Sequence, residues 1–202
     1  MHGKAGAKIG FVAAGKNWLD LIHALSLLGL DETAIERLGI TTYKLGQVYP
    51  IDAVSFREWA DGLDLIVVVE EKRKLIEAQI KEALFDVAGG RRVYGWFKPK
   101  ADGTGREELF QSHYSLDPVV IAGKIGKILI EEGRVSDGLK AAMGRISLAL
   151  AANNATEIAS RVPYFCSGCP HNTSTKVPMG SRADAGIGCH TRVLWRDRET
   201  TG

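Results

Sequence analysis

Three cysteines near the end of the sequence are the residues best suited to chemistry. Cys166 and Cys169 form a Cys-x-x-Cys pair with Gly168 between them, and Cys189 follows a short loop later. Thiolates grouped in this way bind zinc or iron–sulfur clusters. The preceding 165 residues contain no cysteine and three is an odd number, so a secreted disulfide framework explains them poorly. We therefore expect a metal site in a reducing cytosol, with unliganded thiols as the alternative.

The residues around the cysteines could contact a metal or a cofactor. His171 and His190 each lie close to a cysteine and could be ligands, polar contacts to a cofactor or ordinary histidines. Gly186 and Gly188 could turn backbone N–H groups toward an anion or form a plain tight turn. A thioredoxin-like motif fits poorly, because that motif lies at a strand–helix junction, whereas Cys166 follows a helical stretch and precedes a polar loop.

Two other stretches resemble sites, and each has a simpler explanation. Residues 10–16 match the start of a P-loop, but Asn17 stands where a Ser or Thr would bind magnesium, and Gly10 lies inside an expected strand. We interpret this match as chance. The charged run at 70–74 follows a buried strand at the edge where open sheets bind ligands. A solvated helix start is the simpler explanation there, and a subunit contact is the alternative.

The elements that must position these residues follow from hydrophobic periodicity. The continuous apolar run at 65–69 is typical of a strand covered on both faces. Apolar residues at helical spacing predict helices between the strands, the first of them capped by Asn17. This alternation indicates a doubly wound α/β fold with a mostly parallel sheet. We expect strands near 8–13, 40–45, 64–69 and 92–97, and helices at about 17–28, 31–38, 52–60 and 73–87.

The rest of the sequence changes character twice. A Gly/Lys/Asp loop at 98–106 marks the expected end of an α/β domain that spans 1–100. Asp117-Pro118 starts a helix and Ser136 starts another, so we expect residues 101–160 to form a loop and helical connector. Residues 161–202 are rich in Gly, Cys, His, Ser and Thr without periodicity, and we expect a separate part there.

Composition excludes several classes of protein. Apolar residues make up 45% and charged residues 25% of the 202 residues, which is typical of a soluble globular protein with a proper core. The formal net charge of +2 is too balanced to indicate binding to nucleic acid or to a membrane surface. No apolar run reaches membrane-spanning length, and the N-terminus has no signal-peptide core.

The cysteine segment and the α/β part together resemble a known family. The stretch from Phe165 to Cys189, with its Cys-Ser-Gly-Cys-Pro-His and Gly-Ile-Gly-Cys-His, resembles the opening of the thiamine-diphosphate-binding domain of fused bacterial indolepyruvate:ferredoxin oxidoreductases. The stretches Lys8-Ile-Gly-Phe-Val, Tyr43-Lys-Leu-Gly and Val69-Glu-Glu-Lys-Arg are similar to the transketolase C-terminal-like domain of that family.

The resemblance implies a reaction and a set of cofactors. An aryl 2-oxoacid is decarboxylated on thiamine diphosphate with Mg²⁺, electrons leave through iron–sulfur clusters to ferredoxin, and the acyl group passes to coenzyme A. Carried over to this sequence, Cys166, Cys169 and Cys189 are implied ligands of a [4Fe-4S] cluster. The implied cofactor contacts are Gly168, His171, Gly186, Gly188 and His190, the last three near the diphosphate or thiazolium.

Parts of the family pattern have no match here. The fourth cluster ligand, the Mg²⁺-binding segment and the glutamate that activates the aminopyrimidine are not found in the sequence. The resemblance therefore implies an internal piece of a longer polypeptide, inactive by itself, whose partners are its other domains and a second copy in a homodimer.

A second hypothesis comes from a different class of protein. Cys166, Cys169, Cys189 and either His190 or His171 could close a four-ligand zinc site in a non-catalytic α/β interaction module. Adjacent Cys189 and His190 are awkward joint ligands, which weakens this hypothesis. A Rossmann-type dehydrogenase is set aside because the sequence has no Gly-x-Gly-x-x-Gly fingerprint.

Overall fold

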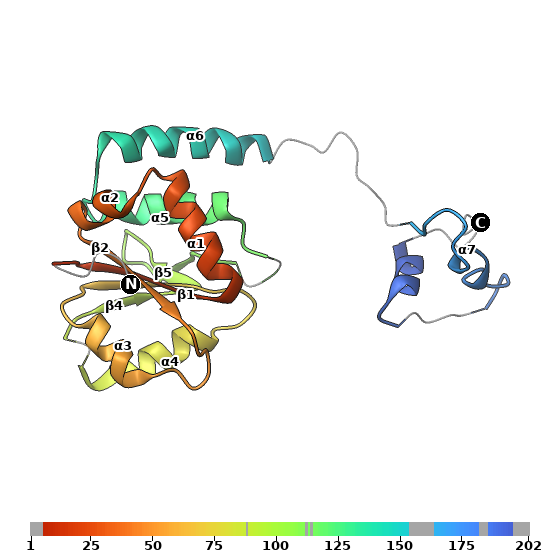
Figure 1. Cartoon of the computed structure of the whole chain (residues 1–202), viewed down its shortest axis with the longest axis horizontal. Coiled ribbons are helices and arrows are strands. Elements are labelled where there is room, and N and C mark those ends of the chain that lie inside the picture. The colour runs from red at the N-terminus through yellow and green to blue at the C-terminus, as the bar shows by residue number, and fades with distance from the viewer. Residues whose placement is uncertain are drawn as a thin grey trace. The chain divides into compact units, whose positions relative to one another are not determined.

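The computed structural model describes residues 6–87, 89–111, 113, 115–153, 164–181 and 186–195. The chain divides into two compact units, residues 1–154 and 155–202 (Figure 1). None of the helices among these described residues combines the length and the apolar character that crossing a bilayer requires.

The first unit is built on a parallel sheet of four strands. The strands are β1 (Ile9–Ala14), β2 (Ile40–Leu45), β3 (Leu65–Val69) and β4 (Arg92–Tyr94), in the order β2-β1-β3-β4. Every neighbouring pair is parallel, and Ile9 of β1 pairs with Ile40 on one side and Leu65 on the other. All five residues of β3 are buried, as the continuous apolar run predicts. The expected parallel α/β sheet is confirmed.

The fourth strand is shorter than expected. It ends at Tyr94, whereas the sequence predicts a strand to residue 97. The backbone N–H of Trp96 donates to Glu77 Oε2 at 3.0 Å, and a Cβ at Gly95 would lie 2.1 Å from the same oxygen. This close approach to Glu77 draws the chain away from β3 directly after Tyr94.

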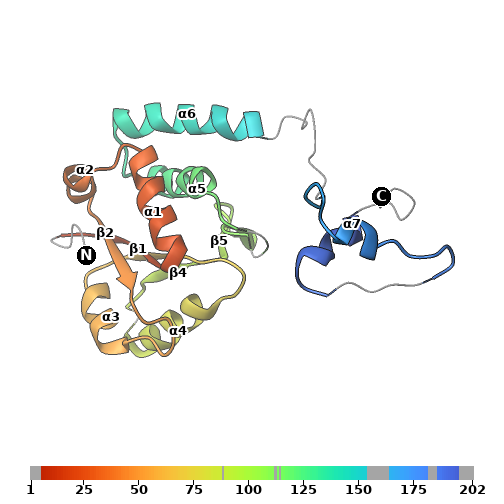
Figure 2. The ribbon, with the colours of Figure 1, turned by 45° about the vertical axis from the view of Figure 1, so that its right-hand side comes forward.

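Helices cover both faces of the sheet (Figure 2). One face carries α1 (Gly15–Leu27), α2 (Glu32–Arg37) and α5 (Pro118–Glu131), with α6 (Asp137–Asn153) lying outside α5. The other face carries α3 (Ala53–Ala60) and α4 (Leu75–Leu84), which continues as the 3-10 helix η1 (Phe85–Val87). The expected doubly wound arrangement is therefore present.

Several helix starts agree with the sequence and one does not. The carboxylates of Asp31, Asp52 and Asp117 accept N–H bonds from the first turns of α2, α3 and α5. Asn17, however, is not a cap: it lies inside α1, which begins at Gly15 directly after β1. The Asn17 side chain is instead buried.

Alternation along the strands divides the core into two clusters. Phe11 and Val67 face α1 and α5, whereas Val12 and Val68 face α3 and α4. In the second cluster the Trp59 ring lies over β1, and a Cβ added to Gly10 would lie 2.5 Å from it. Gly10 is therefore a packing position within a strand, which supports interpreting the P-loop match as chance.

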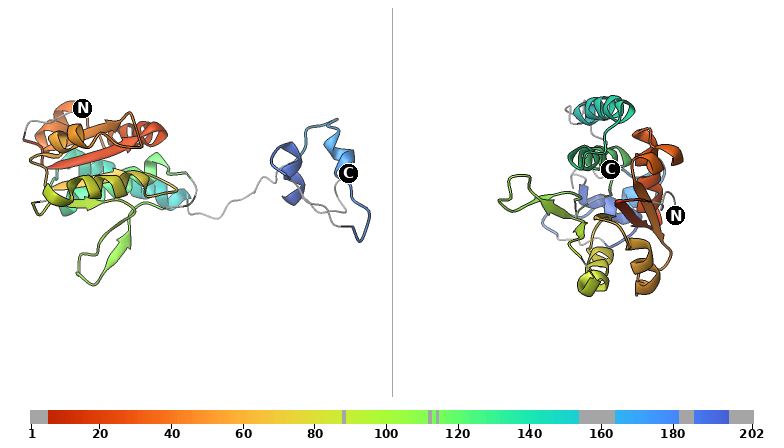
Figure 3. Two further views of the ribbon diagram at one scale, coloured as in Figure 1. Left: turned by 90° about the horizontal axis from the view of Figure 1, so that it is seen from below. Right: turned by 90° about the vertical axis from the view of Figure 1, so that its left-hand side faces the viewer.

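The expected boundary at 98–106 lies instead inside a β-hairpin. The strands β5 (Phe97–Pro99) and β6 (Arg106–Glu108) pair antiparallel, and Figure 3 shows the hairpin extending from the body of the unit. Beyond the hairpin, Leu109, Phe110 and Leu116 join the same buried cluster as α1 and α5. The helices expected to form a connector are therefore part of the first unit, because their apolar faces complete its core.

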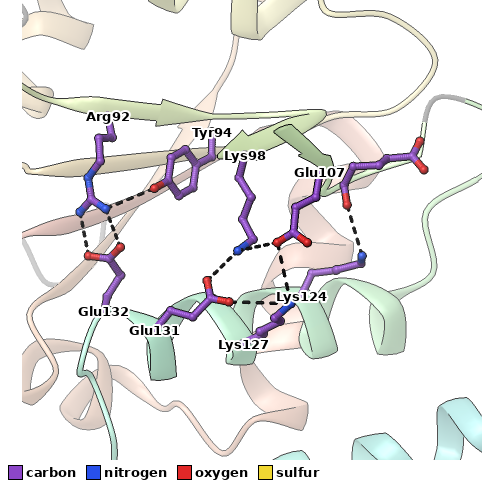
Figure 4. A network of polar contacts seen from close by, with 9 residues as sticks. Arg92, Tyr94, Lys98, Glu107, Lys124, Lys127, Glu131 and Glu132 are labelled. Atoms are coloured by element: carbon purple, nitrogen blue, oxygen red, sulfur yellow. Dashed lines mark hydrogen bonds and ion pairs between the residues drawn. The ribbon is translucent and has the colours of Figure 1, made fainter. Parts of the chain in front are cut away.

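A polar network ties the hairpin to α5 (Figure 4). The Lys98 amine lies 2.8 Å from Glu107 of β6 and 2.7 Å from Glu131 of α5, and its side chain is almost fully buried. Burial alone would lower the pKa of Lys98, but the hydrogen bonds to Glu107 and Glu131 outweigh it and raise that pKa. Beside it, Arg92 forms two 2.7 Å contacts with Glu132.

The second unit contains two short helical segments among its described residues. These are α7 (His171–Ser174) and the 3-10 helix η2 (Cys189–Trp195). Phe165 is buried, whereas Met179 and Ile187 are fully exposed. The three cysteines and both histidines of the expected site lie in this unit.

Candidate functional site in the cysteine segment

The Cys-x-x-Cys pair is held in a tight turn. The Cys169 N–H donates to the Cys166 carbonyl at 3.0 Å, and Gly168 between them has a left-handed φ of +72°. The Asn172 side chain donates to the same carbonyl at 3.2 Å and so fixes the turn against α7. Cys166 is exposed and Cys169 half-buried, and both are free thiols. The turn thus presents two soft ligands on one short loop.

His171 lies against the second cysteine. Its Nδ1 is 3.3 Å from Cys169 Sγ, so a proton on Nδ1 would be donated to the sulfur. The imidazole stacks on Phe165 with 5.3 Å between ring centroids and 22° between planes. Because Phe165 is buried, this stack holds the imidazole in position beside the thiol. The sequence singled out His171, but the role of Phe165 depends on packing that no motif shows.

The second histidine extends the same stack. The ring centroids of His171 and His190 are 6.3 Å apart, with 18° between their planes. Gly186 and Gly188 leave room for the His190 ring, since a Cβ at either position would lie 3.1 to 3.3 Å from it. The structure therefore brings four of the expected contact residues, both histidines and both glycines, into one place.

The loop before η2 uses its own polar groups. The Gly188 N–H donates to Thr191 Oγ1 at 3.0 Å, and the Thr191 hydroxyl donates to the Gly186 carbonyl. This closes a tight turn in which the Gly188 N–H is already engaged. The turn interpretation of the two glycines fits this arrangement, and an anion at Gly188 would have to displace Thr191.

The metal ligands are only partly assembled. Among the residues described in this unit, no three His, Cys, Asp or Glu side chains are close enough together to hold a metal ion. Cys166 and Cys169 share one turn, and Cys189 begins η2. The set of donors, three free thiols flanked by two imidazoles, is chemically suited to iron–sulfur or zinc binding.

Sequence reasoning missed the contacts that close this unit. Arg192 of η2 donates to the Tyr164 carbonyl at 2.7 Å and so joins the end of the segment to its beginning. Thr191 closes the glycine turn, and Phe165 supports His171. In the sequence, the one signal that could have pointed to these three residues is that they lie close to the cysteines.

Comparison with known proteins agrees with the resemblance found in the sequence. Curated relatives include the indolepyruvate oxidoreductase subunit IorA of Thermococcus kodakarensis, 24% identical over 95% of this chain and 26% of the relative. The same subunit of Methanothermobacter thermautotrophicus is 28% identical over 84% of this chain and 22% of the relative. The chain thus spans about a quarter of the length of these relatives.

A solved structure and a family model were also matched. The structure, titled split gene transketolase, inactive beta4 tetramer, aligns at 15% identity over 71% of this chain and 39% of its own, with a TM-score of 0.37, too low to support an argument. The family model, described as indolepyruvate oxidoreductase domain, matches residues 1–153. Since that match covers most of the sequence, the chain belongs to the indolepyruvate oxidoreductase domain family.

Proposed function

We propose that this chain is part of a thiamine-diphosphate-dependent 2-oxoacid:ferredoxin oxidoreductase. The reaction converts indolepyruvate or another aryl pyruvate and coenzyme A into acyl-CoA and CO₂. The bond between the carbonyl and carboxyl carbons breaks and CO₂ leaves. A thioester bond forms to the coenzyme A sulfur, whose proton is released, and two electrons pass singly through iron–sulfur clusters to ferredoxin. The family match over residues 1–153 and the names of the relatives support this proposal.

In this proposal the second unit binds an iron–sulfur cluster. Cys166, Cys169 and Cys189 supply three thiolates to a [4Fe-4S] cluster in the full-length protein, and the fourth ligand comes from elsewhere. The observation that carries this step is the Cys166–Cys169 turn, with two free thiols on one loop and an imidazole 3.3 Å from one sulfur. Hydrogen bonds to cluster sulfurs help set the reduction potential, and His171 is placed to make one.

In this proposal the remaining expected residues contact thiamine diphosphate. Thiamine diphosphate with Mg²⁺ would supply the carbanion-stabilising chemistry of decarboxylation. His171 and His190 offer imidazole edges beside the cysteines, while Gly168, Gly186 and Gly188 allow the backbone to approach closely. Because the Gly188 N–H is engaged by Thr191, it could contact the diphosphate only after Thr191 moved away.

The proposal also includes partners and a compartment. Ferredoxin, coenzyme A, the other domains of the same polypeptide and a second copy in a homodimer complete the enzyme, which works in the reducing cytosol. The 202-residue chain alone is expected to be inactive, since it spans about a quarter of its relatives. An anaerobic assay with indolepyruvate, coenzyme A, thiamine diphosphate, Mg²⁺ and a viologen acceptor tests this, and reproducible turnover would contradict it.

The decisive test replaces cysteines in the full-length protein. Cys166→Ser or Cys169→Ser should lower the iron content, remove the visible absorption of the cluster and abolish ferredoxin reduction. Ser167→Ala, between them in the same turn, is the matched control and should keep all three. A triple cysteine variant that retains iron and ferredoxin reduction would refute the assignment. Stoichiometric zinc in a colourless, anaerobically purified protein would favour the zinc-stabilised interaction module.

A further inference from the structure

The first unit contains a crevice that the proposed function does not use. Strands β1 and β3 are neighbours, yet β1 continues into α1 on one face of the sheet and β3 into α4 on the other. Connections that leave in opposite directions open a crevice at the carboxyl ends of the strands, where parallel sheets bind ligands. A pocket of about 360 Å³ lies there, lined among others by Ala14, Asn17, Val69, Glu71, Arg73 and Leu75.

An unused hydrogen-bond donor belongs to Asn17, one of the residues that line this pocket. Asn17 is only 9% exposed, and its side-chain nitrogen is buried without a hydrogen-bond partner in the described part of the chain. Buried amide groups are almost always paired, because an unpaired one costs free energy. The unpaired amide nitrogen could therefore be satisfied by an acceptor that a bound molecule supplies.

The start of α1 adds further donors at the same place. Its N-cap residue, Ala14, offers no side-chain acceptor, and its first turn contains no acidic residue. Gly15 has a φ of +53° and open space where a Cβ would lie. A left-handed residue followed by a helical turn directs successive N–H groups to one side, and the helix dipole adds positive potential there.

The carboxylates at the pocket are already committed to other groups. Glu70 accepts the N–H groups of Ile76 and Glu77 at 2.8 and 2.9 Å. It is therefore a buried cap of α4 rather than the solvated helix start that its sequence suggests. Glu71 accepts the Leu116 N–H at 2.8 Å and pairs with Lys72 at 3.0 Å.

One cationic side chain at the edge of the pocket has no partner among the described residues. Arg73 is exposed and lines the pocket; its backbone N–H donates to the Glu71 carbonyl at 2.8 Å, but its guanidinium has no ion pair or hydrogen bond within the described residues. Lys16 is different, since its amine is held by Asp20 and by the Leu116 carbonyl. The side-chain groups at the crevice without a partner among the described residues are thus donors, the Asn17 amide nitrogen and the Arg73 guanidinium, and they lie near the first turn of α1.

We propose that this crevice binds a small organic anion. Its carboxylate or phosphate lies at the start of α1, within reach of the Asn17 amide and Arg73, and its apolar body lies against Val69 and Leu75. The pocket volume suits a ligand of one ring and one anionic group. This site is formed by residues of the first unit alone, and it does not depend on the proposed oxidoreductase activity.

The test uses the 202-residue chain and four probes. Phenyl phosphate and phenylacetate are titrated in heteronuclear NMR experiments. Inorganic phosphate, which has the anionic group without a ring, and benzyl alcohol, which has the ring without a charge, are titrated for comparison. Saturable shifts of the Gly15, Lys16 and Asn17 amides with phenyl phosphate or phenylacetate, and weaker ones with benzyl alcohol, support the proposal. The tighter of the two anions identifies the head group. No saturable shift with either at millimolar concentration, or equal binding of benzyl alcohol, overturns it.

Two variants test whether the named donors act. Asn17→Leu should weaken probe binding by about tenfold or more, while the melting temperature stays the same or rises because an unpaired buried donor is removed. Arg73→Gln changes an exposed side chain and should also weaken binding, whereas Arg106→Gln, on the β5–β6 hairpin, should not. Unchanged binding in both Asn17→Leu and Arg73→Gln would refute the site.

Discussion

The two units of this chain are stabilised in different ways. The first buries large side chains completely on both faces of its sheet, among them Trp59, Phe11 and Phe110. In the described part of the second unit, Phe165 is the one apolar side chain that is buried, and most contacts are short-range hydrogen bonds within turns. Yet the second unit carries the cysteines and histidines that can do chemistry.

The residues that stabilise the fold and the residues that could do chemistry therefore lie in different units of the chain. Burial of apolar surface offsets the conformational entropy lost on folding, and the first unit has ample burial. A polar segment with three thiols needs another source of order, and metal binding can supply it, because ligand binding to the folded form adds to folding free energy. Under the proposed function, we expect the cysteine segment to gain order when it binds a metal or packs against the rest of its domain.

The largest expected effect is a contrast in amide hydrogen exchange. In the isolated chain, amides of β1 and β3 should exchange at rates set by global unfolding, and those of α7 and η2 should exchange orders of magnitude faster. Mass spectrometry of peptides from both units measures this directly. Equal protection in the two units without metal would remove the basis of the comparison.

Truncating a core aromatic should distinguish the units by stability. Trp59 is 2% exposed and packs with Tyr43 and Phe56, so Trp59→Ala should lower the free energy of unfolding by about 3 to 5 kcal/mol. Met179→Ala in the second unit removes a side chain that is 97% exposed and should change it hardly at all. Urea denaturation followed by circular dichroism provides the measurement. A similar loss in the two variants would contradict the assigned difference in packing.

A smaller effect should follow from the Lys98 network, and it should depend on pH. Lys98→Met removes the contacts to Glu107 and Glu131 and should cost about 1 kcal/mol near neutral pH. The hydrogen bond to Lys98 lowers the pKa of Glu107. The contribution of Glu107 to the free energy of unfolding is therefore present above the ordinary carboxyl pKa and is lost as pH falls. The raised pKa of Lys98 means that its contribution is lost only in strongly alkaline solution.

The measurement compares the two proteins across pH. The difference in unfolding free energy between wild type and Lys98→Met should be largest from mildly acidic to mildly alkaline pH and should shrink toward pH 3. Lys100→Met, at the exposed tip of the same hairpin, is the matched control. A difference that stays constant down to pH 3 would show that the methylene stem of Lys98, rather than its charge, provides the stabilisation.

The sequence predicted features that depend on local signals, and it did not predict those that depend on long-range packing. Local signals predicted the strands and the helix starts near Asp31, Asp52 and Asp117, and they left a tight turn as one of two alternatives for Gly186 and Gly188. The end of β4 could not be predicted, because it depends on Glu77, which is distant in sequence from Gly95. The Lys98 network and the place of α5 in the core also depend on long-range packing. Residue types in the sequence suggested a metal site, but how its ligands would be arranged depends on contacts between residues that are distant in the sequence.

The smallest expected effect concerns backbone strain at the pocket loop. Lys72 has a φ of +67° and is the one non-glycine residue with positive φ among those described, whereas in the second unit such angles occur at Gly168, Gly180 and Gly188. A left-handed conformation costs a side chain about 1 kcal/mol or more, and only a well-packed surrounding structure can impose it. Lys72→Gly should therefore stabilise the first unit by about 0.5 kcal/mol, after the entropy cost of glycine and the loss of an exposed ion pair with Glu71.

Comparison within the loop makes this last prediction specific. Lys72→Asn should have an intermediate effect, because asparagine tolerates the left-handed region, and Lys72→Val should destabilise, because a β-branched residue does not. Arg73→Gly, one residue later and without a positive φ, should lower stability and not raise it. Thermal unfolding of the four variants ranks them. If Lys72→Gly and Arg73→Gly change stability in the same direction, the strain at Lys72 is not imposed by the packed core, and that contrast between the two units fails.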